Sequence, residues 1–503
     1  MAQQVLFDIQ KSDKCGRYAT ASKNLAEGET IFSEIPFAFG PKTDSPVVCL
    51  GCCTPTDGSI LCSSCQWPVC GPECEQIPAH KQQECKIFSK EGVKFQSVSD
   101  PTDICPQIEC ITPLRVLLTL ETNSERWNKE VEMMESHSEE RKTKPVWEFN
   151  QINVVNFLRG PCKLDRFDED LIHKVCGILD VNAFEARTQS GYSIRCLYPK
   201  LAILNHNCVS NITHSIESTG VGDENDFRVN VRANVAVKKG EELCSSYTYS
   251  LWPTIVRREF LKESKYFECC CKRCTDPTEL ETHMSSLKCN KCDNGLITSI
   301  NPLDDSAIWK CSHCTFTTPS EAVRKVFAKI QSEIDEVEYL EGGQAIEHRE
   351  QLCRKYKSVL HPRNAYNVIL RVALSQLYGK IDGYSLEDLP DLLLERKMEM
   401  CKLVLQVADV IEPGCSRLRG LTLYELHVPL ILLAKNQYAA GEIDKDGLRK
   451  KLNEAIEVLE KSVKILSLEP PGTTEGTLGQ MANQNLTQLK ENLEIMIETA
   501  DQY

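Results

Sequence analysis

Alternating and helical patterns of apolar residues divide the first half of the chain into segments of different structure. Residues 5–40 alternate apolar and polar side chains, which predicts short strands. Residues 108–180 carry helical patterns with a charged break near 121–147, and residues 181–250 return to short strands and turns. The pattern therefore predicts an α+β fold for this half.

From about residue 319 onward, nearly the whole chain has the pattern of amphipathic helices. Paired helices of this length favour a TPR-like array, although no clean repeat of about 34 residues is present. Pro429 lies inside one helical run and should kink or break it, because proline lacks the backbone N–H and clashes with the preceding turn. The expected helices span residues 320–338, 343–360, 364–380, 386–411, 416–440, 443–467 and 475–500.

Length, charge and hydropathy narrow the possible classes of protein. A chain of 503 residues is too long for one compact core and suggests roughly three domains. No stretch reaches the ~18 apolar residues of a membrane span, so no membrane association is expected. The start of the chain lacks the features of a signal peptide, which predicts an intracellular protein of the nucleus, the cytoplasm or both. A net charge of −14 argues against strong direct nucleic-acid binding, which needs a basic face.

Cysteine is unusually frequent in the chain, with 27 residues. Such a number indicates either disulfides in an oxidising compartment or thiolate metal ligands in a reducing one. The length of the chain, the missing signal peptide and the repeated C-x-x-C pairs favour metal ligands.

A first cysteine-rich stretch, residues 49–85, has few apolar residues and cannot fold around a core of its own. It contains eight potential metal ligands, and because tetrahedral zinc takes four ligands, two zinc ions are predicted. Binding of these ions would supply the folding free energy that the segment lacks. The eight residues are Cys49, Cys52, Cys62, Cys65, Cys70, Cys74, His80 and Cys85.

A second stretch has the spacing of a zinc ribbon, with two C-x-x-C pairs separated by 18 residues. Gly295 and Trp309 fit its knuckle turn and a small core. His313 lies between two of the cysteines and is an alternative ligand. The expected ligands of this structural zinc ion are Cys289, Cys292, Cys311 and Cys314.

Three further segments carry residues with possible chemical roles. They read LYPKLAILNHNCVSN at 197–211, GEELCSSY at 240–247 and LWPTIVRREFLKESKYFECCCKRC at 251–274. In this order and spacing, they resemble the SET and post-SET core of the SMYD family of protein-lysine methyltransferases, and residues 49–85 resemble the MYND finger of that family. The resemblance covers nearly the whole chain. The additional cysteine pairs of the ribbon make the chain most similar to the arthropod-type members.

The resemblance implies a β-rich SET domain that is split by the MYND finger and followed by zinc modules and an all-α TPR-like domain. The implied overall class is α+β. The expected parts are an N-terminal SET segment at 1–48, the MYND finger at 49–85, a helical SET insertion at 86–180, the core SET region at 181–250, the post-SET zinc site at 251–276, the zinc ribbon at 285–318 and the helical domain at 319–503.

The resemblance also implies an S-adenosylmethionine-dependent enzyme that methylates lysine side chains of histones or other proteins, with a role in transcriptional regulation. A sulfonium methyl group is already activated, so such an enzyme mainly positions it for in-line attack. A dry channel beside the sulfonium cation favours the neutral lysine amine, which is the nucleophile. Tyr247 matches the active-site tyrosine of the family. The matching cofactor residues are Gly16, Arg17, Asn182, Asn205, His206 and Phe267.

The family pattern also groups the metal ligands. Its MYND finger binds one zinc ion through the first and third pairs of ligands and the other through the second and fourth pairs. Its post-SET site joins the cysteine of NHNC to the three cysteines of C-x-C-x2-C. Together with the ribbon, these sites imply about four zinc ions. The implied groups are Cys49, Cys52, Cys70 and Cys74; Cys62, Cys65, His80 and Cys85; and Cys208, Cys269, Cys271 and Cys274.

Two features of the sequence depart from the family. Four residues, and not the usual three, separate His80 from Cys85. Tyr18 stands where the cofactor-binding G-x-G motif that begins at Gly16 has its second glycine, whose missing side chain lets the backbone approach the cofactor. A tyrosine there either clashes with the cofactor or points away from it, unless the motif is locally shifted in register. The sequence therefore leaves open a second class of function, a catalytically weak SET and MYND scaffold that binds protein partners as a transcriptional or signalling adaptor.

Protein partners are expected under both hypotheses. MYND fingers that resemble this one bind proline-containing peptide motifs, and the enzyme hypothesis adds a protein substrate with an accessible lysine. We expect a monomer. The substrate lysine and the degree of methylation have no signature in the sequence.

Overall fold

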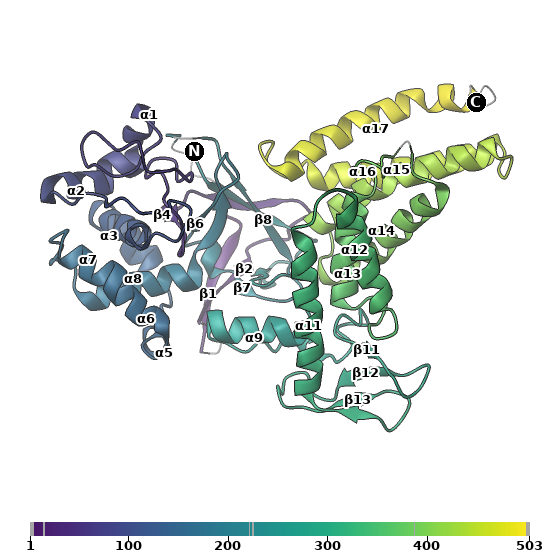
Figure 1. The fold of residues 1–503 in the computed structure, drawn as a ribbon, viewed down its shortest axis with the longest axis horizontal. Helices are drawn as coiled ribbons and strands as arrows, with labels where there is room; N and C mark the ends of the chain where they lie inside the picture. The colour runs from purple at the N-terminus through teal and green to yellow at the C-terminus, as the bar shows by residue number, and fades with distance from the viewer. Residues whose placement is uncertain (1–4, 14–15, 221, 224–225, 387, 499–503) are drawn as a thin grey trace. The chain divides into compact units, whose positions relative to one another are not determined.

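The computed structural model describes residues 5–13, 16–220, 222–223, 226–386 and 388–498, which form two compact units (Figure 1). None of the helices described is both long and apolar enough to cross a membrane. The first unit comprises Met1–Thr20, Thr30–Leu204 and His214–Arg232, and the second comprises Ala21–Glu29, Asn205–Thr213 and Ala233–Tyr503.

In the described part of the chain, short strands form three small sheets that belong mainly to the first unit. They come from residues 5–40 and 181–250, the two segments for which the sequence predicts strands. Phe7 and Phe32 pack edge to face at 5.2 Å and join the first sheet to the second. The sheets are, in strand order, β1 (Phe7–Ser12) and β2 (Gly16–Ala21); β3 (Thr30–Glu34), β9 (Arg228–Ala233) and β8 (Ile212–Glu217); and β4 (Ala38–Pro41), β6 (Ser193–Leu197) and β5 (Phe184–Arg187).

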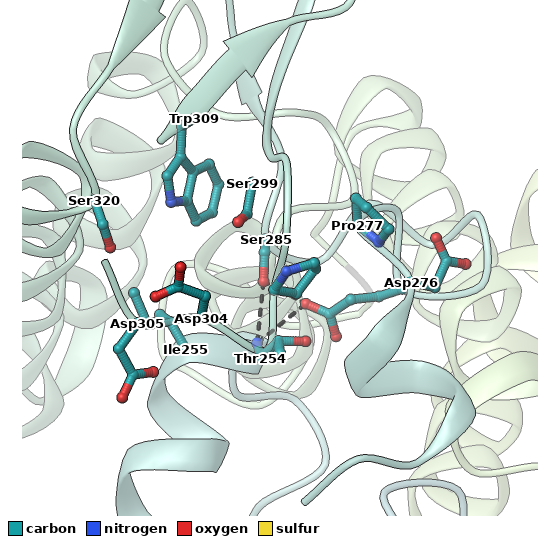
Figure 2. Close-up of a pocket in the computed structure, with 12 residues that line it drawn as sticks. Thr254, Ile255, Asp276, Pro277, Ser285, Ser299, Asp304, Asp305, Trp309 and Ser320 are labelled. Carbon is teal, nitrogen blue, oxygen red and sulfur yellow. Dashed lines mark hydrogen bonds between the residues drawn. The ribbon is translucent and has the colours of Figure 1, made fainter. Parts of the chain in front are cut away.

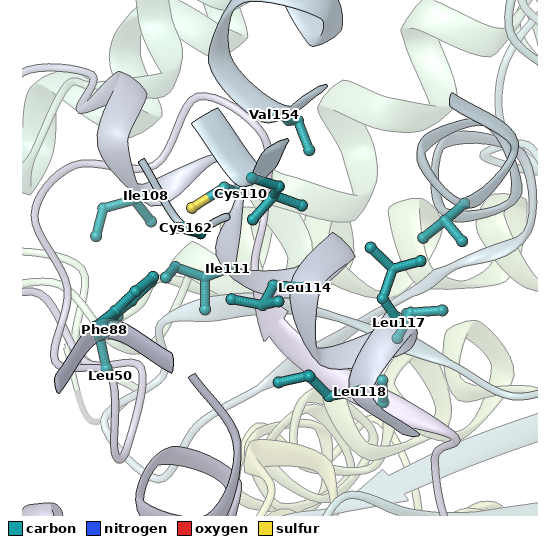
Figure 3. Close-up of a cluster of buried hydrophobic side chains, with 14 of the residues drawn as sticks. Leu50, Phe88, Ile108, Cys110, Ile111, Leu114, Leu117, Leu118, Val154 and Cys162 are labelled. Carbon is teal, nitrogen blue, oxygen red and sulfur yellow. The ribbon is translucent and has the colours of Figure 1, made fainter. Parts of the chain in front are cut away.

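The core of the first unit surrounds α3 (Ile111–Thr122), as Figure 3 shows. This helix is apolar on nearly all sides, and Ile111, Leu114 and Leu117 are fully buried. A helix of this composition is stable only inside a core, and α3 packs on β4 and α8 (Glu169–Asn182). The other helices of the unit are α1 (Pro72–Glu75), α2 (Cys85–Glu91), α4 (Ser124–Arg126), α5 (Ser138–Arg141), α6 (Pro145–Asn150) and α7 (Asn156–Arg159), with short 3-10 or π turns at Pro106–Ile108, Trp127–Val131, Gln151–Val155 and Leu201–Ile203.

The first cysteine-rich stretch shares this core and does not build one of its own. Trp67 stacks on Phe88 of α2 with ring centres 4.3 Å apart, and its indole N–H donates to the carbonyl of Val93 at 2.9 Å. Both rings belong to the same buried cluster as α3. Residues 49–85 are therefore stabilised by packing as well as by any metal that they bind.

The second unit contains two further sheets. In one, β7 (Asn205–His206) pairs in parallel with β10 (Cys244–Ser245). The other is the four-stranded antiparallel ribbon of β11 (Leu287–Lys288), β12 (Leu296–Ser299), β13 (Trp309–Cys311) and β14 (Thr317–Thr318). Between the two sheets, the chain forms α9 (Thr254–Lys265) and α10 (Lys272–Thr275).

Among the residues that the structure describes, seven long helices follow the ribbon, and each packs on the next. Alternate helices also touch, because the first, third, fifth and seventh contact one another in series. This contact pattern is that of a helical-repeat array. The α+β class and the helical C-terminal region predicted from the sequence are thus confirmed, whereas the individual domain boundaries stay predictions. The helices are α11 (Ser320–Glu338), α12 (Gly342–Lys355), α13 (Ala365–Leu377), α14 (Asp391–Ile411), α15 (Arg417–Ala439), α16 (Lys445–Leu466) and α17 (Thr474–Glu498).

The break predicted at Pro429 does not occur, because α15 runs through this residue without interruption. Pro429 is buried, and α15 packs on both α14 and α16. The apolar surface buried along both neighbours outweighs the one backbone hydrogen bond that proline removes. Of the two predicted outcomes, the break is thus wrong, because packing against the neighbouring helices was not considered, and the kink stays a prediction.

Glu34 binds the backbone of the segment that leads to the NHNC motif. Its carboxylate, at the end of β3, accepts the backbone N–H groups of Lys200 and Leu201 at 3.0–3.1 Å. The Nη2 atom of Arg126 lies 3.4 Å from Glu34 Oε1. Burial nevertheless raises the pKa of Glu34 from 4.5 to about 7.

We expect the stability of the first unit to fall as the pH rises from 5 to 8. Because the pKa of Glu34 is about 7 in the folded state and 4.5 in the unfolded state, only the folded state keeps this proton between about pH 4.5 and 7. The stabilisation is therefore complete below about pH 4.5 and is lost as the pH rises through about 7. The full effect is about 3 kcal/mol. Urea unfolding of the wild type and Glu34→Gln across this range measures it. Glu109 also has a pKa raised by burial to about 7, so the variant should lose only part of the pH dependence. An identical dependence in both proteins would contradict the assignment.

Candidate active site and metal centres

The predicted metal ligands gather into four groups, and within each group the ligand atoms all lie within 4.8 Å of one another. Neighbouring sulfur atoms are 3.5–3.9 Å apart. A disulfide would bring them to about 2.0 Å, whereas tetrahedral zinc with Zn–S bonds of ~2.3 Å separates them by about 3.8 Å. Donor type and spacing both fit zinc. The groups are Cys49, Cys52, Cys70 and Cys74; Cys62, Cys65, His80 and Cys85; Cys208, Cys269, Cys271 and Cys274; and Cys289, Cys292, Cys311 and Cys314.

His80 presents its Nε2 to the second group, 3.7 Å from Cys65 Sγ. Its Nδ1 contacts Glu84 Oε1 at 3.1 Å. Arg115 of α3 holds Glu84 in turn, because its Nε and Nη2 donate to the two carboxylate oxygens at 3.1 and 2.6 Å. All of these side chains are buried. A carboxylate on the second nitrogen of a zinc-binding histidine fixes its tautomer and orientation, which is the role that this arrangement assigns to Glu84.

The additional residue between His80 and Cys85 is taken up by one π-helical turn, His80–Glu84. Gln83 has non-helical φ and ψ angles of −110° and −107° within it. A π turn accommodates one inserted residue locally, so the longer spacing still brings both ligands into one group. Glu84 and Arg115 were not among the residues predicted from the sequence to belong to a metal site. The one available signal was the position of Glu84 directly before a ligand.

A buried cation lies against the group that contains Cys208. The guanidinium of Arg257 donates from Nε to Cys208 Sγ at 3.4 Å and from Nη2 to Cys274 Sγ at 3.7 Å. Arg257 and Arg273 also each donate to Glu279 Oε2 at 2.9 Å. Although burial opposes ionisation, the two guanidinium groups lower the pKa of Glu279 to about 2. Because four thiolates around Zn²⁺ carry a net charge of about −2, Arg257 offsets part of the charge at this centre.

Tyr247, His206 and Phe267 form an aromatic cluster beside the same metal group. The ring of His206 is 5.3 Å from that of Tyr247 and 5.9 Å from that of Phe267. The rings of Tyr247 and Phe267 are nearly perpendicular, 6.4 Å apart. Burial raises the pKa of the Tyr247 phenol, so the hydroxyl keeps its proton at neutral pH. The structure therefore brings together three residues that the family resemblance assigns to the active site.

Asn205 comes directly before His206 and lies in β7. The parallel pairing of β7 with β10 sets Asn205 opposite Cys244, on the strand that leads to Tyr247. Its amide Nδ2 donates to Glu242 Oε1 at 3.0 Å. Asn205 is thus held at the aromatic cluster by strand pairing and by its own side chain.

The other three predicted cofactor residues belong to the first unit. Gly16 begins β2 with a φ of +64°, in the left-handed region that favours glycine. Arg17 follows it and lines a cavity of about 240 Å³ together with Lys129 and Lys200. Asn182 ends α8, where its amide donates to the carbonyls of Ile178 and Glu135 at 3.1 and 2.8 Å. Their role as cofactor contacts stays a prediction.

A second cavity lies in the second unit, where the start of α9 meets the ribbon and the start of α11 (Figure 2). The backbone N–H of Thr254 donates there to Ser285 Oγ and to Glu279 Oε1, at 3.0 and 3.1 Å. Its volume is about 20 Å³, which is room for about one water molecule. Small-molecule sites have about 300 Å³ or more, so this cavity is not a candidate for cofactor binding.

Comparisons with known proteins bear on the same residues. The family model described as "SET domain" matches residues 16–248, a range that includes Gly16, Asn205 and Tyr247. The "SET domain-containing protein SmydA-8, isoform A" of Drosophila melanogaster is 29% identical over 336 residues, which cover 64% of this chain and 68% of the relative. The "Histone-lysine N-methyltransferase ASHR1" of Arabidopsis thaliana is 24% identical, covering 88% of this chain and 92% of the relative.

The "N-lysine methyltransferase SMYD2-B" of Xenopus laevis is 26% identical over 53% of this chain and 61% of its own length. A crystal structure of the SET domain of LSMT bound to lysine and AdoHcy aligns at 13% identity over 100% of this chain and 89% of that one, with a TM-score of 0.27 that is too low to compare the folds. The Drosophila relative agrees with the predicted similarity to arthropod-type members. Residues 16–248 thus form a SET domain, and the chain is similar to SMYD proteins of Drosophila and Xenopus.

Proposed function

We propose that this protein is an S-adenosylmethionine-dependent protein-lysine N-methyltransferase. The carrying observation is the partly buried aromatic cluster of Tyr247, His206 and Phe267, which packs against the four-cysteine group that contains Cys208. Relatives in frog and thale cress are named as lysine methyltransferases, which supports the same activity here.

The site residues suit a reaction that needs positioning more than acid–base chemistry. S-adenosylmethionine, when bound, supplies an activated methyl group. Tyr247 keeps its phenolic proton, so its hydroxyl can orient a lysine amine by hydrogen bonding. The perpendicular rings of Tyr247 and Phe267 form an apolar wall. Such a wall limits the access of water and favours the neutral form of the amine, which is the nucleophile.

We further propose the substrates, the partners and the localisation of the protein. The substrates are proteins with an accessible lysine, histone or non-histone, and the activity serves transcriptional regulation. The MYND finger binds proline-containing peptide motifs. The protein acts as an intracellular monomer, in the nucleus, the cytoplasm or both.

Calorimetry with S-adenosylmethionine and a methyl-transfer assay on a histone mixture test the proposal. We expect the purified, zinc-loaded protein to bind the cofactor, and Tyr247→Phe to lower methyl transfer at least ~10-fold, because one positioned hydroxyl in a dry site is worth that much or more. Tyr339→Phe is the control, since Tyr339 is 86% exposed. A folded, zinc-loaded protein that does not bind the cofactor would contradict the enzyme hypothesis and favour the scaffold hypothesis.

The number of zinc ions per chain is a separate prediction, which elemental analysis tests. We expect about four zinc ions per chain, one for each group of ligand atoms that lie within 4.8 Å of one another. Cys274→Ser should lower the number by one. Two or fewer ions in the wild type would contradict the assignment of the four groups.

A further inference from the structure

His206 makes two hydrogen bonds that together determine its protonation pattern. Its Nδ1 lies 2.9 Å from the backbone N–H of Tyr247. A backbone amide can only donate, so Nδ1 is the acceptor and carries no proton. In the neutral ring, the proton is then on Nε2, which lies 3.2 Å from Cys208 Sγ. His206 therefore donates to a metal-ligand sulfur on one side and accepts from the backbone of Tyr247 on the other.

The sulfur of Cys208 receives two donors, His206 Nε2 and Arg257 Nε at 3.4 Å. Two N–H donors therefore converge on the sulfur of one metal ligand, and each becomes displaced if that sulfur moves. The other donor, Arg257, is fully buried, and its Nη1 also pairs with Glu279. Cys208 thus connects the charge of the metal centre to one ring that touches the predicted active site.

The chain around His206 leaves little freedom for this connection to be lost. The backbone N–H of Asn207 donates to the carbonyl of Ser245 at 2.9 Å, which extends the pairing of β7 with β10. His206 and Cys208 are two residues apart, and Tyr247 is two residues beyond Ser245. A shift of Cys208 would therefore reach the backbone of Tyr247 through the imidazole and through the strand pair.

We propose that His206 is a positioning residue that couples zinc at Cys208, Cys269, Cys271 and Cys274 to the placement of Tyr247. Zinc holds the Cys208 thiolate, the thiolate orients the imidazole, and the imidazole accepts the Tyr247 N–H. This role differs from a contact to the cofactor, because it acts through the side chain of His206 toward the metal. The catalytic consequence rests on the proposed methyltransferase function, whereas the coupling of metal to tyrosine does not.

His206→Phe and His206→Gln test the coupling. Phenylalanine keeps a ring against Tyr247 and Phe267 but can neither donate nor accept, whereas the amide of glutamine can replace one of the two hydrogen bonds. His348→Phe, in α12 of the helical array, is the control. Zinc release to a colorimetric chelator is followed, and 3-fluorotyrosine labelling with ¹⁹F NMR reports on Tyr247, whose resonance is assigned by its absence in Tyr247→Phe.

In His206→Phe, we expect one zinc equivalent to be released at least ~10-fold faster than in the wild type, as is usual when a partner of a ligand is lost. The remaining equivalents should be released at the wild-type rate. The Tyr247 resonance should shift in this variant with zinc bound, and in the wild type only when the labile zinc is withdrawn. His206→Gln should restore part of both properties, and this conservative variant also gives the answer if the phenylalanine variant does not fold.

Two results would overturn the coupling. Unchanged release of every zinc equivalent in both variants, with weaker cofactor binding, would reduce His206 to a cofactor contact. A Tyr247 resonance that ignores zinc withdrawal in the wild type would separate the metal from the tyrosine. If the wild type binds no S-adenosylmethionine, the proposed function fails, yet zinc release and the ¹⁹F spectrum still decide the coupling. If the wild type binds S-adenosylmethionine, the kcat for methyl transfer should fall in His206→Phe in proportion to the shift of the Tyr247 resonance.

Discussion

Replacing Arg115 by methionine will destabilise the first unit by about 3–5 kcal/mol, the usual effect of removing one partner from a buried ion pair. Arg115 is fully buried, and both oxygens of Glu84 depend on it. Its guanidinium also donates to the carbonyls of Leu50 and Phe39. Methionine fills a similar volume, so the loss measures the uncompensated carboxylate and carbonyls and not a cavity. Urea unfolding, followed by tryptophan fluorescence, provides the free energy difference.

Two further variants isolate the cause. Lys325→Met removes an exposed i,i+4 partner of Glu321 on α11 and should change stability by less than ~0.5 kcal/mol. Adding Glu84→Gln to Arg115→Met should restore part of the loss, because the unpaired buried charge then disappears. If Arg115→Met is no more harmful than Lys325→Met, the buried network does not stabilise the fold. Zinc release should follow stability, since Glu84 orients His80.

Gly414→Ala will destabilise the second unit by about 3 kcal/mol. Gly414 lies in the corner between α14 and α15 with a φ of +75°, and a Cβ there would come within 1.9 Å of the carbonyl oxygen of Asn234. Left-handed backbone costs a non-glycine residue about 1–2 kcal/mol, and overpacking adds about 1–3 kcal/mol. The corner cannot move away easily, because Cys415 N–H donates to the same oxygen at 2.8 Å. The amide of Asn234 in turn donates to Pro413 O at 2.7 Å.

Gly441→Ala is the matched control for this prediction. Its φ of +74° is nearly the same, but no atom lies within 4 Å of the position of a Cβ. Gly441→Ala should therefore lower the free energy of unfolding only by the cost of left-handed backbone for alanine, about 1 kcal/mol. Urea unfolding followed by far-ultraviolet circular dichroism compares the two variants. Equal losses of stability in Gly414→Ala and Gly441→Ala would mean that the backbone at Asn234 moves away from the new Cβ without a cost in free energy.

Local spacing was enough to mark the candidate metal ligands and to predict the C-terminal helices. A C-x-x-C pair brings two thiolates together through a short turn, so its ligand role depends on only four consecutive residues. Two such pairs were enough to predict the four ligands of the ribbon. The seven C-terminal helices follow from a period of 3.6 residues, which is also local. The grouping of Cys208 with Cys269, Cys271 and Cys274 came instead from the family resemblance, since about 60 residues lie between them.

The partners of these groups could not be found in the sequence. Arg115 and Glu84 are 31 residues apart, and Arg257 and Glu279 are 22 apart. Charged residues are usually exposed, so no local pattern marks these four as buried. The continuity of α15 through Pro429 has the same origin, because only the helices on either side show that its burial outweighs a lost hydrogen bond.

The sequence by itself determined which residues can bind zinc, that the chain is α+β with a helical C-terminal region, and which motif carries Tyr247. Only the tertiary structure decided what those residues touch. It places His206 between a metal ligand and the backbone of Tyr247, Glu84 between His80 and Arg115, and Asn234 against Gly414. The physical reason is range. Periodicity and ligand spacing act over a few residues, whereas the free energy of a buried charge or a close backbone contact depends on residues that only folding brings together.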